Sequence, residues 1–204
     1  AYESDVEVGH SVITGNIAHA SGGGLFIHKG QATIAYNTVR ANTTGGEHGG
    51  GLYLWDSTAT LDNNLVLHNT AEAKGGGLFI WLTDAELSNN IVADNTSANG
   101  GTGLYIQGAS PKIRQTTIAH NPGGSGVHVT NDGDYYSTVM ITNTILVSHT
   151  VGISVTQNNT ATLEATLWGN ATNEAGAGDI LTGTLNGFGP PDFLDPLHSD
   201  YHIG

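Results

Sequence analysis

The sequence predicts an all-β solenoid, a parallel β-helix of about seven turns with roughly 26 residues and three short strands in each turn. The first observation is a glycine-rich motif that recurs at intervals of 27, 26, 26, 23 and 26 residues. Its last glycine stands at Gly24, Gly51, Gly77, Gly103, Gly126 and Gly152. The second observation is a template in phase with the motif: apolar, two variable, small polar, one variable, apolar, two variable, Asn. A fixed period of this length is the signature of a solenoid.

The nine-residue template extends over most of the chain. It is found at 8–16, 34–42, 61–69, 87–95 and 113–121, and with a changed last position at 141–149 and 163–171. Because the glycine motif and the template recur with the same period along the coil, no linker interrupts the repeat. We therefore expect one domain over residues 1–204, with repeat turns at about 6–180 and a C-terminal capping segment at about 181–204.

Each turn contains three candidate strands. Aliphatic and aromatic residues alternate after the glycines, as in 78–80, which is the period of a strand with one buried face. Alanines small enough for a narrow interior precede the template at Ala32, Ala59, Ala85 and Ala161. The third strand carries the template's second apolar residue at Val39, Val66 and Val92. The aliphatic residues of the first strand, the alanines and the valines are predicted to point inward.

A leucine-rich repeat is the competing solenoid, because the segment 61–69 resembles its consensus. That repeat requires Leu where this template has Asn, Ser or Thr, and it places a helix or an extended return where this chain is rich in glycine. No stretch has an apolar period of 3.6 residues, so we expect almost no helix. These differences favour the β-helix.

The composition limits the partners. The chain has 18 acidic and 5 basic residues and a net charge of −13, which opposes binding to nucleic acid and to anionic membranes. No apolar run approaches the roughly 20 residues that cross a bilayer, so we expect no membrane insertion. Cysteine is absent, and the fold must form without disulfides. The first five residues do not resemble a signal peptide, and the chain starts within a repeat, which predicts an excised or processed part of a longer chain.

The Gly-Gly-Gly-Leu-(Phe/Tyr)-(Ile/Leu) motif and the apolar-x-x-Asn template resemble bacterial right-handed parallel β-helix proteins of the pectin-lyase-like superfamily. Their repeats are similar to those of polymorphic outer-membrane proteins. The resemblance covers residues 6 to about 170, and the tail 191–203 looks like the closing segment of surface proteins of the choice-of-anchor type. It implies a right-handed coil and a secreted or cell-surface bacterial protein, in a family that includes adhesins and enzymes.

The last position of the template places one amide at the same corner of successive turns. These residues are Asn16, Asn42, Asn69, Asn95 and Asn121. Stacked amides can bond to one another and to the turning backbone. We predict that they form a structural ladder.

Two files of residues are predicted to point outward from the strand after the glycines. The first contains Phe26, Tyr53, Phe79 and Tyr105, and the second contains His28, Trp55, Trp81 and Gln107. Exposed aromatic faces suit sugar rings, so Phe26, Tyr53, Trp55, Phe79, Trp81 and Tyr105 are the candidate ligand-binding residues. The alternative is that the rings stack on one another and stiffen the sheet.

Two further groups of side chains could carry chemistry. Ten residues separate Val129 from Val139, and this longer loop contains Asp132 and Asp134, which could act as paired carboxylates, bind calcium or belong to a solvated turn. We expect no other cofactor. Stacked at equivalent corners of three turns are His68, Asp94 and His120, which could share a metal ion or a proton, or represent ordinary surface variation.

The favoured function is an adhesive, carbohydrate-binding or filament-forming surface module. The alternative is a polysaccharide lyase or glycoside hydrolase with its carboxylates in the 131–136 loop, although the few basic residues form no cluster with Asp. Glycans or cell-surface components are the expected ligands. Self-association, laterally or end to end, is predicted from an outward file of largely apolar residues: Val12, Thr38, Leu65, Ile91, Thr117, Ile145 and Leu167.

Overall fold

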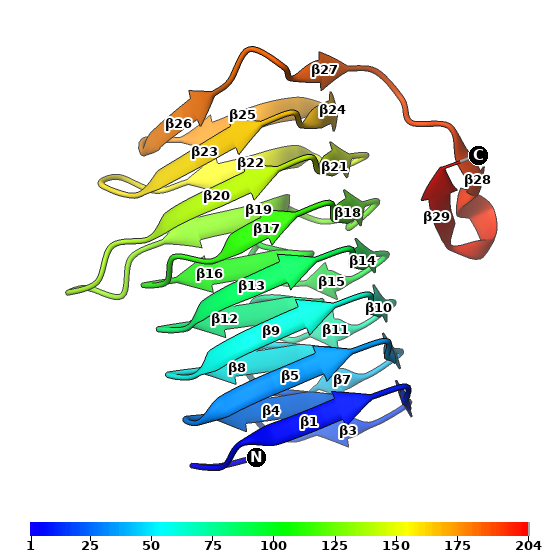
Figure 1. Ribbon diagram of the computed structural model, residues 1–204, viewed down its shortest axis with the longest axis vertical. Coiled ribbons are helices and arrows are strands. Elements are labelled where there is room, and N and C mark those ends of the chain that lie inside the picture. The colour runs from blue at the N-terminus through cyan, green and yellow to red at the C-terminus, as the bar shows by residue number, and fades with distance from the viewer. Residues whose placement is uncertain (204) are drawn as a thin grey trace.

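The computed structural model describes residues 1–203, which wind into a parallel β-helix with a short C-terminal hairpin beside it (Figure 1). Strands of successive turns stack into four parallel sheets, numbered I to IV in the order in which the chain visits them. Within residues 1–203 the helical content is one 3-10 turn, η1 (Pro196–His198). The predicted all-β solenoid is confirmed, and the leucine-rich alternative is excluded.

The strands are listed here by sheet. Sheet I contains β1 (Val6–Gly9), β5 (Gln31–Ala35), β9 (Thr58–Asp62), β13 (Asp84–Ser88), β17 (Lys112–Arg114), β20 (Thr138–Thr142), β23 (Thr160–Glu164) and β26 (Asp179–Thr182). Sheet II contains β2 (Val12–Thr14), β6 (Thr38–Arg40), β10 (Leu65–Leu67), β14 (Ile91–Ala93), β18 (Thr117–Ala119), β21 (Ile145–Val147), β24 (Leu167–Gly169) and β27 (Gly187–Phe188). Sheet III contains β3 (Ile17–Ala18), β7 (Thr43–Thr44), β11 (Thr70–Ala71) and β15 (Thr96–Ser97). Sheet IV contains β4 (Leu25–His28), β8 (Leu52–Trp55), β12 (Leu78–Trp81), β16 (Leu104–Gln107), β19 (Ser125–Thr130), β22 (Val151–Val155) and β25 (Thr172–Gly176). The antiparallel hairpin is β28 (Phe193–Asp195) and β29 (Asp200–Ile203).

Sheet III is an addition to the three predicted strands per turn. Its two-residue strands occur in four turns, after which the chain passes from β18 to β19 without a further strand. That change falls between Gly103 and Gly126, where the repeat shortens to 23 residues. The shortened interval therefore marks the loss of a strand.

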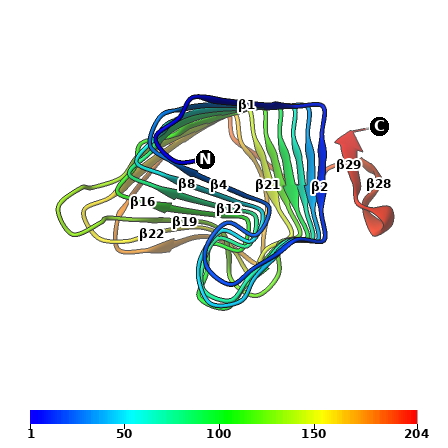
Figure 2. The same ribbon diagram turned by 90° about the horizontal axis from the view of Figure 1, so that it is seen from below.

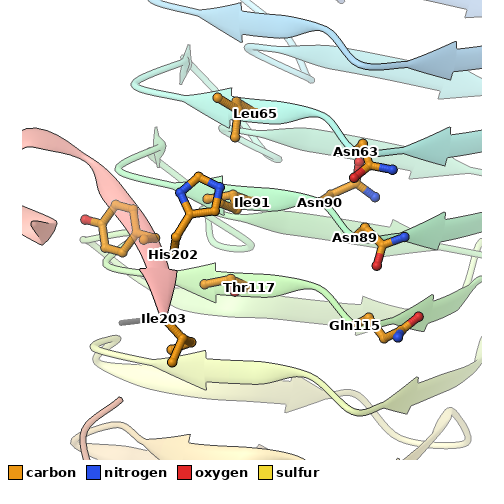
Figure 3. Close-up of a pocket in the computed structure, with 10 residues that line it drawn as sticks. Asn63, Leu65, Asn89, Asn90, Ile91, Gln115, Thr117, His202 and Ile203 are labelled. Atoms are coloured by element: carbon orange, nitrogen blue, oxygen red, sulfur yellow. The ribbon is translucent and has the colours of Figure 1, made fainter. Parts of the chain in front are cut away.

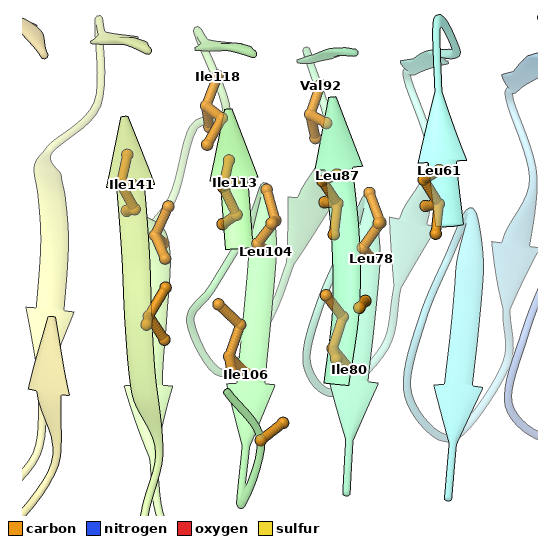
Figure 4. Packing of buried hydrophobic residues seen from close by; sticks show 14 of the residues in the cluster. Leu61, Leu78, Ile80, Leu87, Val92, Leu104, Ile106, Ile113, Ile118 and Ile141 are labelled. Carbon is orange, nitrogen blue, oxygen red and sulfur yellow. The ribbon is translucent and has the colours of Figure 1, made fainter. Parts of the chain in front are cut away.

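The inward residues stack directly on their counterparts in the next turn. Leu78 pairs with Leu52 and with Leu104, and all three are fully buried in the core that Figure 4 shows. The predicted alanines are also buried, as are the three valines of sheet II. Burying a Leu, Ile or Val side chain contributes roughly 1.5–3 kcal/mol, so the repeated stacks of such side chains inside the coil stabilise it strongly.

The recurring glycine of the motif is explained by close approach of successive turns. A Cβ atom on Gly77 would lie 2.7 Å from the carbonyl oxygen of Gly103, and Gly51 stands in the same relation to Gly77. Contacts this short exclude any side chain. The period of the glycine series thus follows from the spacing of the turns.

Sharp corners between the sheets use the left-handed backbone conformation at residues other than glycine. The corner that follows sheet II has positive φ at Ala41, His68, Asp94 and His120. The corner from sheet I to sheet II has it at Tyr36, Asn63, Asn89 and Gln115. Such residues are strained by roughly 1–2 kcal/mol each, and the regular stacking of the turns holds them in place.

We predict that Ala41→Gly stabilises the protein by about 0.5 kcal/mol, because relief of the left-handed strain exceeds the entropy cost of glycine. Ala41 is exposed, with a φ of 52°, so packing contributes little to the difference. Urea unfolding measures the change. The matched control, Ala32→Gly in strand β5, should instead destabilise, and a less stable Ala41→Gly variant would contradict the prediction.

The Asn column forms a hydrogen-bonded ladder at the corner from sheet II to sheet III. Asn69 Nδ2 donates to Asn95 Oδ1 at 3.1 Å and to the Val39 carbonyl at 2.9 Å. Its own Oδ1 accepts from the backbone N–H and the side-chain amide of Asn42, both at 3.0 Å. The ladder continues where the template changes, because the His149 ring accepts from Asn121 and bonds to Asn170.

A second ladder, which was not predicted, lies at the corner from sheet I to sheet II. Asn37 donates to Asn64 Oδ1 at 3.1 Å, and Asn64 donates to Asn90 Oδ1 at 3.0 Å. These residues occupy the small polar position of the template. The sequence shows the period of these Asn residues. It does not show that they lie just before the strand or that their side chains bond to one another.

Candidate functional site

The first aromatic file of sheet IV lies on the outer side of the sheet but is covered. Tyr53, Phe79 and Tyr105 are only 4, 1 and 5 % exposed, so the prediction that they form an exposed platform is wrong. The loops between sheets III and IV, which bulge below the coil in Figure 2, fold over them. The His48 ring stacks on Phe79 with centroids 4.5 Å apart, and Lys74 Nζ lies 4.8 Å from the centre of the Tyr105 ring.

The second file is a continuous stack along the coil. His28 and Trp55 are parallel with centroids 3.7 Å apart, and Trp55 and Trp81 are parallel at 4.8 Å. Both faces of Trp55 are therefore occupied, which is the self-stacking alternative considered from the sequence. Trp55 and Trp81 remain half-buried, and their ring edges are what a ligand can reach.

A hollow of about 320 Å³ adjoins this stack. It is lined by Ala20, Ser21, Phe26, Glu47, Tyr53, Trp55 and Trp81. The Glu47 carboxylate accepts a hydrogen bond of 2.7 Å from Ser21 Oγ. The sequence indicated the aromatic residues but not Ala20, Ser21 and Glu47, whose loops reach the sheet only in the folded coil.

Two buried polar atoms near the hollow have no hydrogen-bond partner within residues 1–203: Trp81 Nε1 and His48 Nδ1. Burial, followed by the charge of Lys74, lowers the pKa of His48, which favours the neutral ring. A buried polar group without a partner costs roughly 1–3 kcal/mol. The loop that carries Glu47 and His48 and the strand that carries Trp81 therefore each contain a buried polar atom without a hydrogen-bond partner among the described residues.

The longer loop between sheets IV and I lies at the other end of the strands. Gln107 Nε2 donates to Asp132 Oδ1 at 3.1 Å, which ties the loop to the second file. Asp134 instead lines a groove of about 830 Å³ together with Asp56, Asp84 and the exposed Tyr135 and Tyr136. The two predicted carboxylates therefore have different surroundings, one bonded to Gln107 and one in the groove.

His68, Asp94 and His120 are brought together, as their equivalent positions suggested. His120 Nδ1 lies 2.6 Å from Asp94 Oδ1, and His68 Nε2 lies 3.7 Å from Asp94 Oδ2. Asp94 also accepts from Ser199 and Tyr201 of the C-terminal segment. Across residues 1–203, no group of three or more His, Cys, Asp or Glu side chains has an arrangement suited to a metal ion.

The comparisons agree with this architecture. A family model for a right-handed β-helix region matches residues 5–138 and 76–176, so the two overlapping matches cover most of the coil. The chain belongs to the right-handed β-helix family. The search of curated proteins and the search of solved structures each gave no match.

Family membership establishes the fold and the handedness of this right-handed β-helix. The matched residues end at 176, before the C-terminal segment, and include both sides of the hollow. Within the described residues, no helix is both long and apolar enough to cross a membrane.

Proposed function

We propose that this right-handed β-helix is a secreted or cell-surface adhesive module that binds a glycan in the hollow beside Trp55 and Trp81. One observation carries the proposal. The hollow combines apolar walls, to which Phe26, Trp55 and Trp81 contribute, with the Glu47 carboxylate. A sugar ring presents both C–H groups and hydroxyl groups, and such a surface can contact both.

The stacked rings make the hollow rigid before a ligand binds. Trp55 is held between His28 and Trp81, so little side-chain entropy is lost on binding. The ring edges and Phe26 offer contact to the C–H groups of a sugar. Glu47 can accept hydrogen bonds from two adjacent hydroxyl groups while Ser21 holds one of its oxygens.

The charge of the chain favours a neutral glycan. With a net charge of −13 and a carboxylate in the hollow, a polyuronate would be repelled unless a cation bridged the two. The enzyme alternative has weaker support, because no Lys or Arg side chain lines the groove that holds Asp134.

We predict that Glu47→Gln weakens glycan binding at least about 10-fold while leaving the melting temperature unchanged, since hydrogen bonds to a charged group are worth roughly 1.5–3 kcal/mol. Glu47 is exposed, so its replacement does not disturb the core. A neutral glycan array identifies the ligand, and titration calorimetry measures the affinity. Replacing Trp55 or Trp81 by Ala is a poorer test, because it would also break the stack.

Glu72→Gln is the matched control, since Glu72 is an exposed glutamate in the equivalent loop one turn further on and does not line the hollow. It should bind like the wild type. A reducing-end release assay on the same glycans separates binding from cleavage. Equal affinities for Glu47→Gln and Glu72→Gln, or no binding to any neutral glycan, would refute the proposal.

A further inference from the structure

The C-terminal segment leaves the coil after β27 and returns along the outside of sheet II. Figure 1 shows the β28–β29 hairpin beside the coil, back from the end at which the chain left it, and the apolar contacts of the hairpin are with β10, β14, β18 and β21. Residues 190–203 therefore do not extend the stack of turns. We call this segment the strap.

The strap covers the outward file from which self-association was predicted. Tyr201, only 3 % exposed, joins Leu67, Ile91, Ala93, Ala119 and Val147 in one apolar cluster. Leu65, Ile145 and Phe193 pack against this cluster, and Figure 3 shows Leu65 and Ile91 next to β29. We call the residues of sheet II in this cluster, together with the adjacent Asp94, the strip. Most of the apolar side chains of this file, from which a contact with a second chain was predicted, are covered by the chain's own C-terminal segment.

Polar contacts add specificity to this apolar contact. Tyr201 Oη donates to Asp94 Oδ1 at 2.9 Å, and Ser199 Oγ donates to Asp94 Oδ2 at 3.0 Å. Asp94 is also bonded to His120, and its side chain is 12 % exposed. Burial and the bond to Asp94 raise the pKa of Tyr201, which keeps the phenol protonated as a donor. The strip thus recognises both the shape and the hydrogen-bonding groups of the strap.

The strap contacts are independent of the core. Their cluster is separate from the one inside the coil, and two hollows of about 330 and 350 Å³ flank the strap. Partners in the contact are 105 to 131 residues apart in sequence. The connection between β27 and β28 is short and contains Gly189, Pro190 and Pro191, and it alone joins the strap covalently to the coil.

We propose that the strip is an interaction surface between copies of this chain, which the strap of a second copy occupies in place of the chain's own. Exchange keeps every contact described above and needs no new interface. A short linker gives an effective concentration on the order of 1 mM, so exchange is expected when the local concentration approaches that value, as on a crowded surface. Reciprocal exchange closes a dimer, whereas successive exchange produces a linear assembly.

A complementation experiment with full-length chains tests the proposal. One variant has a defective strap, Tyr201→Ala, and the other has a defective strip, Asp94→Ala with Ile91→Lys. Neither can close on itself, but the intact strap of the second fits the intact strip of the first. We expect each variant alone to have the monomer mass by light scattering, and the mixture to show twice that mass. A mixture of the Tyr201→Ala chain with a chain defective in both strap and strip should stay monomeric.

Circular dichroism and melting curves first establish that both variants keep the coil, which is expected because the substituted residues lie outside its interior. A mixture that stays at the monomer mass would overturn the proposal. If a variant fails to fold, wild-type chains with two isotopic labels are mixed at about 1 mM, diluted, and weighed by native mass spectrometry. Mixed-label dimers support exchange, and their absence overturns it. Neither readout depends on glycan binding.

Discussion

Asn69→Ala is expected to lower the free energy of unfolding by about 3–5 kcal/mol, the largest effect of any single substitution considered. Asn69 is fully buried in the middle of the ladder. Its loss leaves the backbone N–H of Asn42 without an acceptor and removes a donor from the Val39 carbonyl. Each unsatisfied buried group costs roughly 1–3 kcal/mol, and the cavity left by the amide adds to the sum.

Asn16→Ala is the matched control for this substitution. Asn16 stands at the exposed end of the same ladder and donates to Asn42 Oδ1 at 2.9 Å, with water available to replace it. Its replacement should cost less than about 1 kcal/mol. Urea unfolding of both variants compares the two positions. Equal losses would mean that the ladder does not stabilise the coil through burial of its amides.

Acidification from pH 7 to pH 5 is expected to destabilise the protein by about 2 kcal/mol through His149 alone, because one pKa unit corresponds to roughly 1.4 kcal/mol. Burial lowers the pKa of His149 to about 4 despite its bond to Asn170. The unfolded chain binds a proton near pH 6.5, whereas the folded chain does so only near pH 4. The stability is therefore complete above about pH 6.5 and decreases as the pH falls toward 4.

His128 should add to the same loss, since burial lowers its pKa to about 4 as well. Urea unfolding between pH 7.5 and 4.5 measures the slope of stability against pH. His149→Asn should reduce this slope, because Asn can take the same place in the ladder without titrating in this range. His19→Asn, at an exposed position, is the control. A slope that is unchanged by His149→Asn would show that this ring does not cause the acid sensitivity.

The repeat could be predicted because it is a local pattern reproduced in register. Two kinds of residue recur with the length of a turn. They are the glycines, at which a neighbouring carbonyl leaves no room for a side chain, and the apolar residues that face the narrow interior. The pairing of Leu65 with Ile91, and of Ile91 with Thr117, follows from that period. Strand register is specified strongly wherever one face is buried.

Several features of the candidate site could not be predicted, because they depend on loops that the period does not describe. Glu47 and His48 lie in a connection between sheets, and only its folding over β12 covers Phe79. The alternation of side chains along a strand distinguishes inward from outward, but outward does not mean exposed when a loop lies above the sheet. This is why the first aromatic file was wrongly expected to face solvent.

The sequence by itself determined the coil, its three main strands per turn and the Asn column, because each is a repeated contact between a residue and its counterpart about 26 positions away. Only the tertiary structure decided what lies on the outside of the coil. The contact of Tyr201 with Asp94 joins residues 107 positions apart and occurs once, so no repeat in the sequence predicts it. A repeated contact can be recognised from its spacing, whereas a contact made once depends on the path of the whole chain.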